Sequence, residues 1–218
     1  MAKFKYSQNI ESFIFDGDDV SLSINGKGTT AVWVDESSDV TITLKGKGFA
    51  AEEGNENLLG SGKIDSAVIK DGDNDLIVSA TNLNAKAAGL TNAFELGGAQ
   101  AIAFYLAKGD DKVTGSGQGD YIVGGSGDDV LTGKGGSDTF YFHAQQSSPE
   151  LKVMAAEYDV ITDFDVKGNN ADRLAFDQDF DVKAQGQDTL LKFDDGSSLL
   201  LEGVKKAQFQ DYLDTWVS

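Results

Sequence analysis

Acidic and apolar positions repeat every nine residues between residues 109 and 142. An apolar residue follows each recurring aspartate by two positions, which gives Asp111 with Val113, Asp120 with Ile122, Asp129 with Leu131, and Asp138 with Phe140. Glycines, which permit sharp turns, are concentrated in the intervals. The three residues after each aspartate predict a short strand with its middle side chain inward. A flexible Gly-rich linker would have no reason to keep this period, so we expect a folded coil.

Two such turn-and-strand units close one coil of a solenoid. Positions eighteen apart then stack about one strand spacing apart, roughly 4.8 Å. This stacking puts Asp111 over Asp129, and Asp120 over Asp138. Two carboxylates at that distance repel by about 4 kcal/mol at an effective dielectric near 20. The coil therefore needs a cation between its turns.

Calcium is the ion that this gap favours. Ca²⁺ accepts about six to eight oxygen ligands in flexible geometry, and these include the carbonyl groups of a glycine-rich turn. Mg²⁺ demands a tighter octahedron and tends to keep its waters. Zinc prefers His or Cys, and the chain has one His and no Cys.

The first hundred residues carry a weaker repeat. DDVSLSINGKG (18–28) and SDVTITLKGKG (38–48) share five residues in register, twenty positions apart, and the apolar segment AVWV (31–34) lies between them. Apolar centres continue at intervals of nine to ten residues as far as AIAFYLA (101–107). We therefore predict that residues 10–106 form an irregular parallel β-solenoid, which continues into the calcium-binding coil of residues 107–142.

The glycine period stops after Phe142, and the rest of the chain predicts a cap. Ser148-Pro149 has the residue types of a helix start, for a short helix to about residue 157. TLLKFDDGSSLLLEGV (189–204) predicts a β-hairpin turning at Asp195-Gly196, and residues 205–218 predict a helix. The open end of a solenoid must be covered, so we assign residues 143–218 this role. The predicted fold class is all-β, a parallel β-solenoid with a small hairpin and helix cap.

Composition narrows the choice of partners and of cellular location. Lys and Arg total 18 against 36 Asp and Glu, so the net charge is −18. Such a surface disfavours nucleic acid and anionic membranes and attracts divalent cations. The lack of cysteine excludes disulfides and fits an extracellular protein stabilised by metal. The sequence has no apolar run long enough for membrane insertion, and residues 1–13 lack the apolar core of a cleaved secretory signal.

Together these features resemble the RTX (haemolysin-type) calcium-binding proteins that Gram-negative bacteria secrete. Gly124 to Thr132 matches their nonapeptide G-G-x-G-x-D-x-U-x without a mismatch. The resemblance is most specific over residues 107–142 and implies a calcium-binding β-roll. It extends more loosely to DVITDFD (159–165) and the 189–204 hairpin, which are similar to the region after the repeats in serralysin-type proteases and alginate epimerases.

The resemblance also implies a ligand set, with each ion held between consecutive coils. The first site would take the carbonyls of Ala107, Gly109, Gly124 and Ser126 with the carboxylates of Asp111 and Asp129. The second would take the carbonyls of Ser116, Gln118, Gly133 and Gly135 with Asp120 and Asp138. A partial third site at Gly125, Gly127 and Asp129 would lack a good partner coil.

The sequence departs from the repeat pattern at three places. Leu106-Ala107-Lys108 replaces the first glycines, Gln118 stands at a usual glycine, and Lys134 replaces the second glycine of its repeat. Because several implied ligands are backbone carbonyls, these changes affect the turn geometry more than the number of ligands.

Relatives in this family leave the cell through type I secretion machinery that reads an uncleaved C-terminal signal. The ending Asp214 to Ser218, acidic and then apolar, is similar to that of the protease branch, although a terminal helix fits the same residues. The resemblance thus implies an extracellular or cell-surface location. Calcium outside the cell would fold a chain whose carboxylates repel one another in the cytosol.

The sequence lacks the motifs of two enzyme classes that carry RTX repeats, the zinc proteases and the lipases. The chain has no H-E-x-x-H zinc motif and no G-x-S-x-G elbow, and its lone His143 directly follows the last repeat strand. We therefore expect a non-enzymatic calcium-binding module with a structural, adhesive or matrix role. Two alternatives stay open: a module whose first hundred residues bind extracellular polysaccharide, and a carbohydrate-active solenoid with acidic catalysts on that face.

Overall fold

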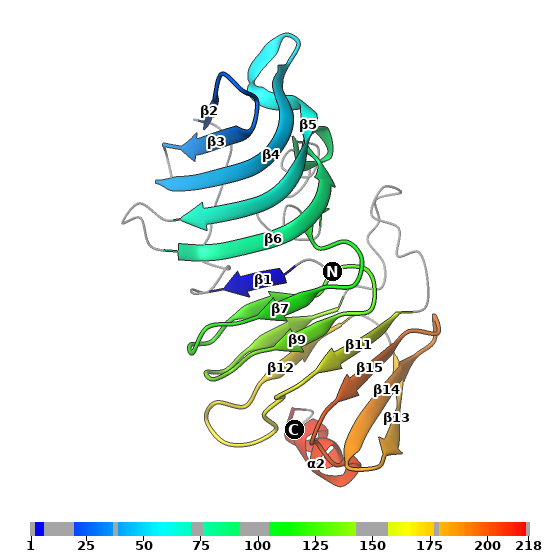
Figure 1. Ribbon diagram of the computed structural model, residues 1–218. Coiled ribbons are helices and arrows are strands. Elements are labelled where there is room, and N and C mark those ends of the chain that lie inside the picture. Colours follow the sequence, from blue (N-terminus) through cyan, green and yellow to red (C-terminus); the bar gives the residue numbers. More distant parts are fainter. Residues whose placement is uncertain are drawn as a thin grey trace. The chain divides into compact units, whose positions relative to one another are not determined.

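A computed structural model describes residues 3–6, 20–36, 39–70, 76–91, 105–142, 157–176 and 179–216. The chain divides into two compact units, Met1–Lys108 and Gly109–Ser218 (Figure 1). In the part of the chain that the structure describes, no helix has the length and apolar character to cross a membrane.

The first unit is a curved antiparallel sheet. Its strands lie in the order β1-β6-β5-β4-β3-β2, and each described pair is antiparallel (Figure 1). The strands are β1 (Lys3–Tyr6), β2 (Val20–Ile24), β3 (Thr30–Asp35), β4 (Val40–Glu52), β5 (Asn55–Lys70) and β6 (Leu76–Lys86).

Alternating side chains give this sheet one buried face. Trp33 pairs with Ile42, which pairs in turn with Ile69, and all three side chains are buried. The Trp33 indole N–H donates to the Asn57 carbonyl at 2.9 Å, so the ring is fixed in the core. The first unit therefore has an apolar core of its own.

The prediction of a parallel solenoid over residues 10–106 is wrong for the strands that the structure describes. Residues 7–19 and 92–104 lie outside the described part. A tight turn reverses the chain between β2 and β3, where the Asn25 N–H donates to the Thr30 carbonyl at 3.0 Å. The reversal occupies residues 25–30 with Gly28 at φ +60°, and Asn25-Gly26 at its start is a turn signal that the prediction of a solenoid overlooked. Another reversal between β4 and β5 uses Glu53-Gly54, with Gly54 at φ +89°.

The twenty-residue repeat has a different cause from the one predicted. It relates β2 to β4, which both pair with the intervening strand β3. Two antiparallel strands with their turns occupy twenty residues here, and a solenoid coil would need a similar number. Alternation of side chains is the same in both arrangements, so only the turns reveal the strand direction.

The second unit contains the predicted coil. Its first six strands alternate between two parallel sheets, with β7, β9 and β11 in one and β8, β10 and β12 in the other. Their bounds are β7 (Lys112–Thr114), β8 (Tyr121–Val123), β9 (Val130–Thr132), β10 (Thr139–Tyr141), β11 (Tyr158–Ile161) and β12 (Arg173–Ala175).

The strand register confirms the period of two strands per coil. Val113 pairs with Leu131, and Ile122 pairs with Phe140, each eighteen residues apart. These four side chains are 0% exposed and fill the space between the two sheets. Burying each of them contributes about 1.5–3 kcal/mol, which explains why the apolar position of each nonapeptide is kept.

The parallel sheets continue beyond the glycine-rich repeats. Strand β11 pairs with β9, and β12 pairs with β10. The hairpin of β14 (Asp188–Phe193) and β15 (Ser198–Leu201) turns at Asp195-Gly196 as predicted, with β13 (Phe180–Gln185) beside β14 and with β15 parallel to β11. The further division of residues 107–218 into a repeat domain and a cap stays a prediction.

The predicted C-terminal helix is confirmed as α2 (Lys206–Trp216). Its buried Phe209 and Tyr212 pack against Phe164, with ring centroids 6.4 Å and 5.5 Å away. Phe164 in turn contacts Phe140 of β10, so α2 extends the apolar core of the coil. The short helix predicted from Ser148 falls mostly within residues 143–156, which lie outside the described part.

Candidate metal centre

The glycine-rich turns of the coil stack backbone against backbone. The Gly109 N–H donates to the Ser126 carbonyl at 2.6 Å. Gly127 has φ +116°, and a Cβ atom there would lie 2.5 Å from the Gly109 carbonyl carbon. Gly136 repeats this geometry over Gln118 one strand later. A side chain at Gly127 or Gly136 would therefore collide with the backbone of the adjacent turn.

Buried aspartates connect these turns in two stacks, which we call the aspartate ladders. The Asp111 N–H donates to Asp129 Oδ1 at 2.8 Å, and the Asp120 N–H donates to Asp138 Oδ1 at 2.8 Å. All four residues are at most 2% exposed. The predicted stacking of aspartates eighteen residues apart is thereby confirmed.

Two ladder oxygens are buried without a protein hydrogen-bond partner. Within the described part of the chain, Asp120 Oδ1 and Asp129 Oδ2 are such atoms. An unsatisfied buried oxygen costs about 1–3 kcal/mol, and more when it is charged. An ion between the turns would remove this cost, because a carboxylate oxygen is a ligand that Ca²⁺ prefers.

Burial and mutual repulsion raise the pKa of carboxyl groups in the aspartate ladders. Burial and the neighbouring carboxylates of Asp159, Asp111 and Glu157 raise the pKa of Asp129 to about 9. Burial, with Asp172 and Asp120 adding to it, raises the pKa of Asp138 to about 7. At neutral pH the turns thus hold carboxyl groups that either bind protons or need a cation.

A family model for the RTX calcium-binding nonapeptide repeat matches residues 107–141, in four copies. These residues are RTX calcium-binding repeats. No curated protein matches the chain significantly. The match covers neither the first hundred residues nor the C-terminal region, so the similarity of that region to serralysins and epimerases stays a prediction.

The donor set of the RTX repeats fits calcium. No group of three or more His, Cys, Asp or Glu side chains among the described residues is arranged to hold a metal ion. The predicted sites would need fewer acids, because two aspartates of one ladder would share the ion with backbone carbonyls of their turns. Oxygen-only ligation of this kind suits Ca²⁺ and disfavours zinc.

The structure places most of the predicted ligands in the stacked turns of the second unit. The turn residues assigned to the sites are Gly109, Ser116, Gln118, Gly124, Gly125, Ser126, Gly127, Gly133 and Gly135. The Ser126 carbonyl is an example of a predicted ligand in a stacked turn. It accepts a hydrogen bond from the Gly109 N–H and keeps a second lone pair that could bind an ion. Ala107 is the exception, since it is a buried residue at the end of the first unit. The ligand role of each stays a prediction.

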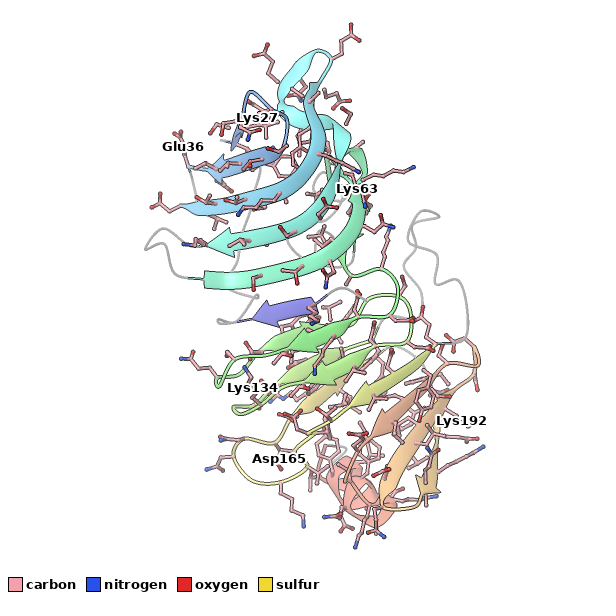
Figure 2. All side chains as sticks on the ribbon, in the orientation of Figure 1. Lys27, Glu36, Lys63, Lys134, Asp165 and Lys192 are labelled. Atoms are coloured by element: carbon pink, nitrogen blue, oxygen red, sulfur yellow. The ribbon has the colours of Figure 1, made fainter. Side chains whose placement is uncertain are left out.

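Lys134 shows how a departure from the repeat pattern is accommodated. It adopts φ +76°, the left-handed conformation expected of the glycine that it replaces. Its ammonium donates to the Gly115 carbonyl at 2.6 Å, and its positive charge opposes the burial that raises the pKa of Asp120. Figure 2 labels Lys134 at this turn and Asp165 in the loop that follows β11.

Sequence reasoning missed the third residue of each aspartate ladder. The Asp129 N–H donates to Asp159 Oδ1, and the Asp138 N–H donates to Asp172 Oδ1, both at 2.9 Å. Asp159 and Asp172 are also buried, at 8% and 3% exposure. Insertions lengthen their spacing to 30 and 34 residues, which hides them from a search for period eighteen. The signal that remained was an apolar residue two positions after each, Ile161 and Leu174.

Proposed function

We propose that the protein is a secreted calcium-binding β-roll protein that folds when it reaches calcium outside the cell, and that it serves there as a structural, adhesive or matrix module. The observation that carries this proposal is the pair of buried, hydrogen-bond-deficient oxygens of Asp120 and Asp129 within the RTX repeats. Those oxygens lie where the stacked turns would bind an ion.

The physical basis is a coupling of folding to metal binding. Without a cation, the aspartate ladders bring buried carboxylates together, and folding must protonate them or overcome their repulsion. Calcium binding supplies the missing charge, so part of the binding free energy becomes folding free energy. Modules that work outside cells bind calcium with dissociation constants of about 10⁻⁴–10⁻³ M, and a cytosol poor in calcium would leave the coil unfolded.

Secretion and a non-enzymatic role rest on supporting features of the sequence. RTX repeat proteins are typically secreted, and the lack of cysteine and the net charge of −18 suit an extracellular, calcium-rich setting. Export would use type I secretion machinery reading the C-terminal residues, of which Val217 and Ser218 lie outside the described part. Calcium ions are the partner that the repeats themselves imply.

A calcium titration followed by far-UV circular dichroism tests this function. We expect β-signal to increase cooperatively at about 10⁻⁴–10⁻³ M calcium, with magnesium having much less effect. Asp129→Ala should shift the midpoint to higher calcium, whereas Asp181→Ala, on the exposed face of β13, should leave it unchanged. A chain with the same spectrum in chelator and in saturating calcium would contradict the proposal.

A further inference from the structure

The turn of residues 124–129 has a neighbour on each side. On one side lies the turn that contains Asp111, as the nonapeptide period requires. On the other side lies the segment Glu157–Asp159, which belongs to no nonapeptide repeat. The Val160 N–H donates to the Asp129 carbonyl at 2.8 Å, and Val160 pairs with Val130, so this segment occupies the place of a further coil.

The contacts on the second side reproduce those on the first. Asp159 Oδ1 accepts the Asp129 N–H at 2.9 Å, as Asp129 Oδ1 accepts the Asp111 N–H at 2.8 Å. Asp128 forms a parallel series, because its N–H donates to Asp110 Oδ1 and its own Oδ1 accepts the Tyr158 N–H. The segment Glu157–Asp159 therefore makes the hydrogen bonds of a repeat, although it lacks the glycine-rich sequence of one.

The 124–129 turn itself contains a buried oxygen that could bind an ion. Asp129 is 1% exposed, and its Oδ2 is a buried oxygen without a hydrogen-bond partner in the described structure. Glu157 brings a further negative charge to the same segment, and its carboxylate accepts a hydrogen bond from the Gly127 backbone. The partner coil that a site at Gly125, Gly127 and Asp129 needs is thus supplied by residues after the repeats.

The other aspartate ladder ends differently. Asp172 uses both of its oxygens, because Oδ1 accepts the Asp138 N–H and Oδ2 accepts the Asp165 N–H at 2.8 Å. Asp163 likewise accepts the Gly133 and Lys134 N–H groups, one with each oxygen. Protein hydrogen bonds therefore satisfy the carboxylates on this side, and no ion is needed there.

We propose that an additional calcium ion binds between the 124–129 turn and the segment Glu157–Asp159, with Asp129 and Asp159 as its carboxylate ligands, and that the Asp172 side has no counterpart. This inference rests on the proposed function, since it extends the calcium stack of the RTX repeats by one coil. Backbone carbonyls of the turn complete the shell, as Ca²⁺ accepts them readily.

Counting bound ions on the full chain tests the proposal. We expect native mass spectrometry to show one calcium fewer for Asp159→Asn than for the wild type, at calcium concentrations where the wild type is saturated. Asparagine keeps an oxygen for the Asp129 N–H and removes only the charge, and the expected loss of affinity at this site is at least about tenfold. The exposed Asp181→Asn is the matched control, and it should keep the wild-type count.

The possible outcomes separate the two proposals. An Asp159→Asn protein that is folded and keeps the wild-type ion count and affinity would overturn the additional site and leave the proposed function intact. A wild type that binds no calcium would overturn both. Terbium supplies a second measurement that leaves the ladder residues unchanged, because an aromatic ring beside a bound lanthanide sensitises its emission. Tyr158→Phe should reduce tyrosine-excited terbium emission without changing calcium affinity, and undiminished emission would contradict the site.

Discussion

Single glycines decide whether the turns of the coil can stack. At Gly127 the chain combines φ +116° with a neighbouring backbone so close that a Cβ would lie 2.5 Å from the Gly109 carbonyl carbon. Gly117 lies in a comparable turn of the same repeats, but a Cβ there would meet nothing within 4 Å. The two positions share their residue type and differ in their backbone conformation and in their surroundings.

We therefore predict opposite outcomes for two alanine substitutions. Gly127→Ala should lower the stability of the calcium-bound protein by about 1–3 kcal/mol through overpacking and backbone strain. Gly117→Ala should change it by no more than about 0.5 kcal/mol. Denaturant unfolding in saturating calcium measures both, and equal effects of the two substitutions would show that the turns do not stack as described.

Stacked turns make the calcium-free coil sensitive to pH. Burial is the main cause that raises the pKa of Asp129 to about 9, of Asp138 and Asp159 to about 7, and of Asp172 to about 6. The ordinary pKa of an aspartate is 3.8. At any pH between 3.8 and these raised values, the folded coil therefore binds more protons than the unfolded chain. The folded coil is therefore fully destabilised at a pH above the folded-state pKa values. This destabilisation disappears as the pH falls towards the pKa of the same groups in the unfolded chain.

The predicted result is that acid partly replaces calcium. In metal-free buffer, β-signal in circular dichroism should increase as the pH is lowered from about 8 towards about 5.5, where most of the raised carboxyls become protonated. In saturating calcium the same change should weaken binding, since protons and calcium compete for the carboxylates. A metal-free signal that stays constant or decreases on acidification would contradict the raised pKa values.

Helix α2 stabilises the coil through aromatic contacts. Phe209 is 0% exposed and lies against Phe164 and Tyr212, and the Tyr212 hydroxyl donates to the Asp172 carbonyl at 2.9 Å. Phe209→Ala should therefore reduce the free energy of unfolding by about 3–5 kcal/mol. Gln210→Ala, one position along on the exposed side of the helix, is the control. A chemical-denaturation midpoint unchanged by Phe209→Ala would argue against this packing.

At the scale of the whole molecule, the two units differ in what holds them together. The first unit has an antiparallel sheet with an apolar core around Trp33, whereas the second unit contains the RTX repeats and both aspartate ladders. Among the described residues, the stacked carboxylates of the ladders thus belong to one unit. We expect calcium to control the folding of the second unit and to leave the first one largely unaffected.

Tryptophan fluorescence can separate the two responses. The chain has two tryptophans, and Trp216→Phe leaves Trp33 as the single reporter of the first unit. Its emission maximum should be the same in chelator and in saturating calcium, because the indole is 2% exposed in a core that lacks ladder carboxylates. Circular dichroism of the same sample should still report the calcium response. A red shift of Trp33 emission in chelator would mean that the first unit also depends on calcium.

The sequence by itself determined the features that are local and periodic. The nine-residue period of aspartate and apolar residues specified the two-strand coil, the burial of positions such as Val113 and the pairing of Asp111 with Asp129. The turn at Asp195-Gly196 and helix α2 were likewise readable, because each depends on a short run of neighbouring residues.

The alternation of side chains did not decide the direction of the early strands, and only the tertiary structure decided the extent of the aspartate ladders. Alternation along β2, β3 and β4 is compatible with parallel or antiparallel neighbours, and the turn within residues 25–30 makes β2 and β3 antiparallel. Asp159 and Asp172 join the ladders through parallel pairing with the preceding coil across insertions of irregular length. A short sequence pattern indicates the geometry of neighbouring residues. Contacts across such insertions join residues far apart in the sequence, and they form only when the chain folds.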